Sequence, residues 1–121
     1  MTVTYLDKIL ERHREMAAAD TRSVGQLIDE ARAMPPARGF RAALVANTKL
    51  GVIAEIKRRS PSKGDLNMRL DPADLARVYE TGGASCLSVL TDVDGFGGSV
   101  DDLQAARRAC SLPVLRKDFT V

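Results

Sequence analysis

Residues 51–66 read GVIAEIKRRSPSKGDL and contain the clearest strand and turn signals of the chain. It opens as a short apolar run, which is typical of a strand, and stops in a Ser-Pro-Ser-Lys-Gly turn. Because successive side chains of a strand point to opposite faces, Val52, Ala54 and Ile56 share an apolar face, and Ile53, Glu55 and Lys57 share the other. The pattern therefore predicts a strand with one face packed under helices and one charged face.

The charges of Glu55 and Lys57 leave two interpretations open. Charged side chains within a strand are costly to bury unless they form ion pairs or take part in a functional site. In one interpretation this is an edge strand whose solvated face carries a cross-strand ion pair. In the other it is a parallel strand whose C-terminal end delivers charged groups to the mouth of an active site.

The rest of the chain alternates between helical and strand patterns. Ser23, Asp71 and Ser99 are expected to cap helices, with Pro72 in the first helical position and Asp102 completing a capping box with Ser99. The expected helices cover 5–18, 23–34, 40–46, 71–82 and the segment from 99 to before 113; further strands cover 84–90 and 113–119, with loops at 60–70 and 93–98.

The order of elements from residue 51 onward is β-α-β-α-β. This order predicts a parallel sheet with right-handed crossovers, either a doubly wound sheet or a segment of a barrel. No G-x-G-x-x-G follows the first strand, which disfavours a dinucleotide-binding fold. Residues 1–50 are expected to form a helical extension, and residues 51–121 the α/β part.

Composition narrows the class of protein. The 121 residues carry a net charge of +2, too small and scattered to indicate a nucleic-acid partner. No apolar run is long enough to span a membrane, and the first residues lack the apolar core of a signal peptide, so a cytoplasmic location is expected.

The two cysteines, Cys86 and Cys110, are expected to be reduced residues of the core. Because His13 is the only histidine, no metal site is expected.

Three motifs together resemble one known family. They are Glu-x-Lys-x-x-Ser-Pro-Ser over 55–62, SVLTDVDGFGGS over 88–99 and LRKDF over 115–119. On these motifs the chain is similar to the indole-3-glycerol phosphate synthase family, enzymes of tryptophan biosynthesis. The resemblance implies a (β/α)8 barrel, of which residues 51–121 would form only the first three strands and two helices.

The resemblance also implies a reaction and a set of residues. The substrate would be 1-(2-carboxyphenylamino)-1-deoxyribulose 5-phosphate, and ring closure would release carbon dioxide and water without a cofactor. Lys117 matches the catalytic lysine and would act as general acid, while Lys57 would hold an anionic group of the substrate and Glu55 would orient both lysines. The substrate-binding residues implied are Ser60, near the phosphate, and Phe96 and Phe119, on either side of the aromatic ring.

A second function class stays open at this point. A three-stranded parallel sheet leaves two unpaired edges, which favour association. The chain is thus expected to be either part of such a lyase or a non-catalytic barrel fragment that self-associates or needs a complementary fragment.

Overall fold

The computed structural model describes residues 2–46 and 48–121, and these form two compact units. The first unit holds the residues up to Ala37 together with Phe119–Val121, and the second holds Arg38–Asp118. Across the described residues, no helix is long and apolar enough to cross a membrane.

The first unit contains two helices whose starts are set by side-chain caps. Helix α1 (Tyr5–Ala19) begins after Thr4, which forms a reciprocal capping box with Asp7. Helix α2 (Val24–Ala33) begins after Ser23, whose hydroxyl accepts a hydrogen bond from the backbone of Gln26. Both helices were predicted, with ends that differ by one residue.

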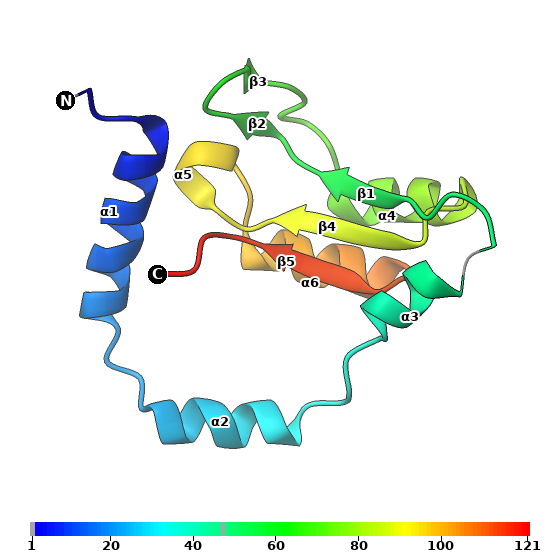
Figure 1. Cartoon of the computed structure of the whole chain (residues 1–121), viewed down its shortest axis with the longest axis horizontal. Helices are drawn as coiled ribbons and strands as arrows, with labels where there is room; N and C mark the ends of the chain where they lie inside the picture. Colours follow the sequence, from blue (N-terminus) through cyan, green and yellow to red (C-terminus); the bar gives the residue numbers. More distant parts are fainter. Residues whose placement is uncertain (1, 47) are drawn as a thin grey trace. The chain divides into compact units, whose positions relative to one another are not determined.

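The second unit contains the sheet (Figure 1). Its elements, in chain order, are α3 (Phe40–Val45), β1 (Ile53–Ile56), β2 (Arg59–Ser60), β3 (Gly64–Asp65), α4 (Pro72–Thr81), β4 (Cys86–Leu90), α5 (Val93–Phe96), α6 (Val100–Ala109) and β5 (Val114–Lys117).

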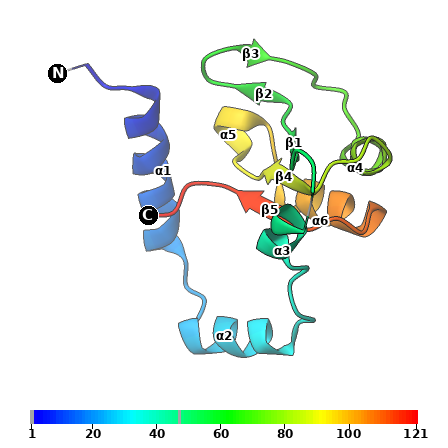
Figure 2. The same cartoon turned by 45° about the vertical axis from the view of Figure 1, so that its right-hand side comes forward.

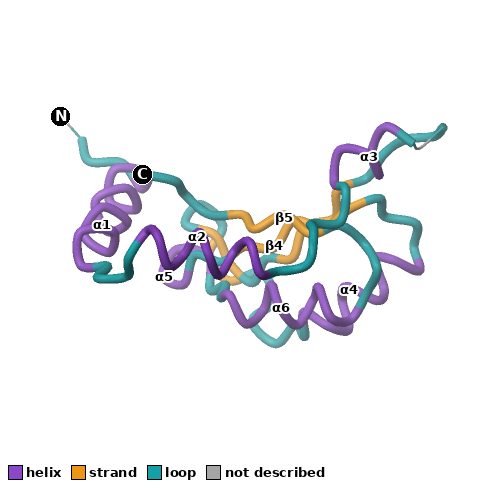
Figure 3. Tube along the Cα trace, turned by 90° about the horizontal axis from the view of Figure 1, so that it is seen from below, coloured by secondary structure: helices purple, strands orange, loops and turns teal. Residues whose placement is uncertain are grey.

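The three longer strands form one parallel sheet in the order β1-β4-β5. The spatial order follows the chain order, and helices α4 and α6 lie on the same side of the strands (Figure 3). A doubly wound sheet reverses its order and places helices on both faces, whereas a barrel keeps one order with its helices outside. The arrangement is therefore that of an open barrel segment.

The helix-facing side of this sheet holds the core. Ala54 and Ile56 of β1 are buried there with Leu87 and Val89 of β4, against Ala76 of α4 and Ala106 of α6 in the same cluster. Alternation along β1 is visible in its burial, because Ala54 and Ile56 are buried while Glu55 is only partly so. The predicted division of this strand into a packed face and a charged face is confirmed for Ala54, Ile56 and Glu55, whereas Val52, predicted on the packed face, precedes β1 and is 42% exposed.

Two predicted loops contain short elements. The 60–70 segment includes β3, which pairs antiparallel with β2 around a turn where Gly64 has φ 68°. The 93–98 segment contains the single turn α5, because the Asp92 carboxylate accepts a hydrogen bond from Gly95 N at 2.7 Å. Figures 1 and 2 show these elements beyond the C-terminal ends of β1 and β4.

The last strand is shorter than predicted. It ends at Lys117 rather than Phe119, so the predicted strand over 113–119 extends two residues too far at its C-terminal end. The neighbouring strand explains the difference. β4 ends at Leu90, whose register partner is Lys117, and the chain then turns into α5, so β4 offers Phe119 no backbone to pair with.

The first residue of the second unit, Arg38, is hydrogen-bonded to the segment between α6 and β5. Arg38 donates hydrogen bonds from Nη1 to the carbonyl oxygens of Cys110 (2.8 Å) and Leu112 (3.0 Å), in the segment between α6 and β5. Helix α3 packs with β4, where the Cys86 thiol donates to the carbonyl of Phe40. The domain boundary at residue 50 stays a prediction, and α3, which precedes it, belongs to the compact unit of the sheet.

Candidate active site

Two lysines share one carboxylate at the C-terminal side of the sheet. Lys117 Nζ lies 2.7 Å from Glu55 Oε2, and Lys57 Nζ lies 2.9 Å from Glu55 Oε1. We call these three residues the lysine–glutamate cluster. Glu55 thus uses both oxygens, each with a different ammonium group, and the cluster carries a net positive charge.

The strand register explains how Glu55 reaches Lys117. Glu55 is aligned with Ser88 on β4 and through it with Leu115 on β5, so Lys117 lies two residues further along. The ion pair therefore spans β4. Backbone support for Glu55 comes from α4, where the Tyr79 hydroxyl donates to the Glu55 carbonyl oxygen at 3.0 Å.

Both sequence interpretations of β1 describe part of this arrangement. In the sheet as described, β1 is an edge strand and its charged face carries an ion pair with another strand. It is also parallel, and the pair lies at the end of the sheet where barrel enzymes place their chemistry.

Opposing effects act on the Glu55 carboxyl. Partial burial raises its pKa, but the hydrogen bonds and positive charges of Lys117 and Lys57 outweigh that effect and hold the pKa below its ordinary value. Glu55 is therefore ionised at neutral pH, which keeps both ammonium groups paired.

Ser60 lies at the start of the hairpin that follows β1. Its side chain is buried, and its hydroxyl accepts a hydrogen bond from the backbone of Lys63 at 3.2 Å. A hydroxyl that accepts still has its own hydrogen to donate. Ser60 is therefore held by the turn while keeping a donor for a ligand oxygen.

The two predicted aromatic contacts lie in different units. Phe96 is the last residue of α5, beyond the end of β4, and is half-buried. Phe119 belongs to the first unit, where its ring centroid lies 5.8 Å from that of His13. Their placement on either side of a substrate ring stays a prediction.

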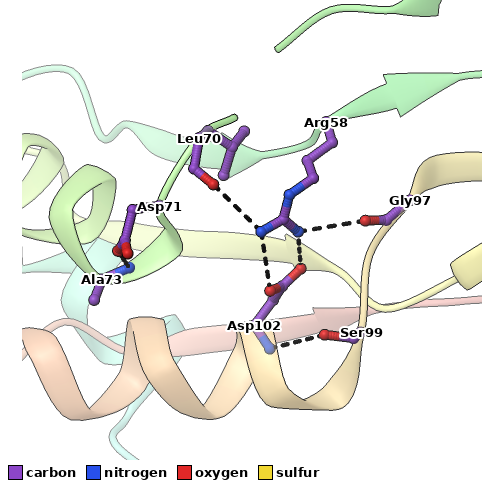
Figure 4. A network of polar contacts seen from close by, with 7 residues as sticks. All are labelled: Arg58, Leu70, Asp71, Ala73, Gly97, Ser99 and Asp102. Carbon is purple, nitrogen blue, oxygen red and sulfur yellow. Dashed lines mark hydrogen bonds and ion pairs between the residues drawn. The ribbon is translucent and has the colours of Figure 1, made fainter. Parts of the chain in front are cut away.

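Arg58, to which no role was assigned from the sequence, connects several loops of the second unit. The Arg58 guanidinium pairs with the Asp102 carboxylate and donates to the carbonyl oxygens of Gly97 and Leu70, both at 3.3 Å (Figure 4). Three loops therefore meet on one side chain: the one after β1, the one before α4 and the one before α6.

Asp102 differs from its predicted role in the same network. The Ser99 hydroxyl accepts from Asp102 N at 3.0 Å, which confirms the cap of α6. The Asp102 carboxylate, read from the sequence as the other half of a capping box, pairs with Arg58. Nothing local in the sequence distinguishes Arg58 from Arg59, so this pairing had no sequence signal.

The cluster has the chemical means for two tasks. An ammonium group can donate a proton, and it can also attract an anion. Because the cluster contains two ammonium groups, one of them can donate the proton while the other binds the anion. A shared carboxylate holds both in place and limits their mutual repulsion. The site thus suits a substrate that carries both an anionic group and a carbonyl or hydroxyl oxygen.

Comparisons with known proteins agree on one family. A family model described as indole-3-glycerol phosphate synthase matches residues 6–121. The curated indole-3-glycerol phosphate synthase of Bordetella pertussis is 53% identical over 121 residues, covering 96% of this chain and 46% of the relative. Curated proteins of the same name from Hyphomonas neptunium (47% identical, 98% and 46% covered) and Acinetobacter baumannii (49%, 98% and 44%) match similarly. The chain thus spans less than half the length of these relatives.

Proposed function

The chain belongs to the indole-3-glycerol phosphate synthase family, and we propose that it supplies the first three strands and the lysine–glutamate cluster of an enzyme with that activity. Family members are (β/α)8 barrels, and the open parallel segment described above is one part of such a barrel. The observation that carries the proposal is the pairing of Glu55 with both Lys57 and Lys117.

The proposed substrate is 1-(2-carboxyphenylamino)-1-deoxyribulose 5-phosphate. Ring closure joins the ring carbon that bears the carboxylate to the ketone carbon of the sugar chain. Carbon dioxide then leaves that ring carbon, and loss of water completes the indole ring.

Lys117 is assigned the role of general acid in this reaction. The ketone carbon becomes electrophilic when its oxygen is protonated, and a positioned ammonium group supplies that proton. Lys57 attracts an anionic group of the substrate, and Glu55 sets the direction of both lysines before substrate arrives.

The remaining assignments concern substrate binding. Ser60 donates a hydrogen bond toward the phosphate, and Phe96 and Phe119 flank the aromatic ring. The phosphorylated substrate is the only small molecule that the proposal requires, and we place the enzyme in the cytoplasm.

Five further strands are needed to close an eight-stranded barrel around this segment. We therefore propose that activity requires the part of the barrel that the curated relatives have beyond their matched segment. The experiment joins residue 121 to that part of the Bordetella pertussis relative and measures formation of indole-3-glycerol phosphate by the chimera.

The expected result is turnover by the chimera and a loss of about a hundredfold or more in kcat on Lys117→Ala, because the general acid is removed. Ser60→Ala is expected mainly to raise KM. Arg107→Ala is the matched control, since it removes an exposed cation on α6, away from the cluster. A folded chimera without turnover, or an active Lys117→Ala variant, contradicts the proposal.

A second candidate function follows from the open sheet edges. In the part of the chain that the structure describes, β1 and β5 each pair on one side only, and Ile53 and Leu115 on the face opposite the helices are both 47% exposed. Such edges favour self-association without catalysis. The mass of the 121-residue chain in solution tests this: a defined oligomer without turnover supports it, and a monodisperse monomer contradicts it.

A further inference from the structure

A single threonine, Thr91, contacts the last two residues of β5, Arg116 and Lys117, and the residue that follows them, Asp118. Thr91, the first residue after β4, is 5% exposed. Its backbone N–H donates to the Lys117 carbonyl oxygen at 3.0 Å, and its hydroxyl donates to Asp118 Oδ2 at 2.6 Å. The same hydroxyl oxygen accepts from Arg116 Nε at 3.0 Å.

The two contacts of the hydroxyl are chemically complementary. A threonine hydroxyl has one hydrogen to donate and lone pairs to accept with. The carboxylate of Asp118 accepts the hydrogen and the guanidinium of Arg116 donates to the oxygen, so both partners are charged and both bonds are of the stronger kind.

The register places Thr91 on the side of the sheet away from Lys117. Leu90 is the partner of Lys117, and Val89 is the partner of Arg116. By alternation Thr91 continues the face of Val89, together with Arg116 and Asp118. Thr91 thus holds the residues on both sides of Lys117 by their side chains and Lys117 itself by its backbone.

The position of the Lys117 backbone matters because few contacts restrain the Lys117 side chain. That side chain is 51% exposed and ends in the ion pair with Glu55. A long exposed lysine has many rotamers of similar energy, so the orientation of its Cα–Cβ bond decides which of them reach the partner.

We propose that Thr91 is a positioning residue that fixes the end of β5 and so directs the Lys117 ammonium toward Glu55. This role rests on the proposed function where it concerns catalysis, but its geometric part concerns this chain alone. Thr91 has no assigned contact with substrate.

The geometric part is tested on the 121-residue chain by brief acetylation followed by mass spectrometry of each lysine. An ammonium group held in an ion pair acetylates slowly, because the reactive form is the free amine. Thr91→Val keeps the shape and the backbone N–H but removes both hydroxyl contacts, and Thr91→Ser keeps the hydroxyl.

We expect Thr91→Val to raise the acetylation rate of Lys117 by about threefold or more, and Thr91→Ser to leave it within about twofold of the original. Lys57 is the internal control, since it pairs with the same carboxylate but is not bonded to Thr91. An unchanged Lys117 rate in Thr91→Val, or an equal rise at Lys57, overturns the proposal.

The catalytic part is tested in the chimera described above. Thr91→Val is expected to lower kcat by about tenfold or more, with KM changed by less than about threefold, because a misdirected acid affects the chemical step. Thr91→Ser is expected to restore kcat to within about threefold. An effect of Thr91→Val on KM alone, or the absence of rescue by Thr91→Ser, overturns the positioning role. An unmutated chimera without activity counts against the proposed function instead. In that case the acetylation result decides the role of Thr91.

Discussion

Arg58 and Asp102 lie 44 residues apart in the sequence and form an ion pair with little exposure of either side chain, 18% for Arg58 and 15% for Asp102. The pair joins the end of β1 to the first turn of α6. Because the Arg58 guanidinium also donates to the backbone carbonyls of Gly97 and Leu70, it restrains the loops that precede α6 and α4.

Removal of the Arg58 guanidinium should destabilise the second unit. Arg58→Met leaves the largely buried Asp102 carboxylate without this partner, so we expect a loss of about 2 kcal/mol in the free energy of unfolding, measured with urea. Arg77→Met is the matched control, because the Arg77–Asp74 pair is exposed and should contribute less than about 1 kcal/mol. A double-mutant cycle with Asp102→Asn that shows no coupling would contradict the assignment.

Glu55 should make stability depend on pH in the acidic range. Its folded-state pKa is lowered below the ordinary 4.5, so its stabilising effect is complete above that value and is lost as pH falls through the folded pKa. The difference in unfolding free energy between the unmutated chain and Glu55→Gln should therefore be about 1 kcal/mol near pH 7 and should shrink as the pH falls below 4.5.

Salt provides the control for the Glu55 prediction. The partly exposed ion pairs of Glu55 are screened at about 1 M NaCl. The difference in unfolding free energy between the unmutated chain and Glu55→Gln at pH 7 should therefore be smaller at that salt concentration. A difference that is constant across pH and salt would mean that Glu55 acts through packing instead of charge.

Gly98 should not tolerate a side chain. A Cβ atom there would overlap the backbone carbonyl of Leu90, which cannot move without disturbing β4. Gly98→Ala should cost about 2–3 kcal/mol in urea unfolding. Gly64→Ala is the comparison, since its Cβ would have open space and only the positive φ opposes it, at about 1 kcal/mol. Equal costs at the two positions would contradict the steric argument.

The two cysteines should resist modification while the chain is folded. Cys86 is fully buried and Cys110 is 8% exposed, both are free thiols, and burial raises the pKa of Cys86. A thiol-specific reagent such as DTNB should react slowly in native buffer and with both thiols in concentrated guanidinium chloride. Rapid reaction of Cys86 in native buffer would show that β4 is accessible.

Local signals in the sequence predicted most of the fold. The start of α4 was read from Asp71-Pro72 and the start of α6 from Ser99, because a cap depends on residues within one turn. The two faces of β1 followed from alternation alone. The hairpin β2–β3 and the single turn α5 were missed, since elements of two and four residues are too short to produce a periodic pattern.

The site was predictable only where its geometry is local or where a motif was available. Glu55 lies in β1 and Lys57 directly follows that strand, two residues later, so alternation along extended backbone places both side chains on one side. Lys117 came from the family resemblance, and its contact with Glu55 depends on a register across β4 that sequence does not specify. The same holds for the Arg58–Asp102 pair, 44 residues apart, and for Thr91, whose side-chain partners Arg116 and Asp118 are 25 and 27 residues away.

The hydrogen bonds of Arg38 limit how far the chain can be shortened from its N-terminal end. A variant that starts at Arg38 keeps the donor for the Cys110 and Leu112 carbonyls, whereas one that starts at Phe40 loses it. The turn that leads into β5 would then have to recruit water in its place. Arg38 therefore helps to order a turn that contains Cys110, 72 residues later in the chain. During synthesis this turn can form its hydrogen bonds with Arg38 only after both segments have left the ribosome.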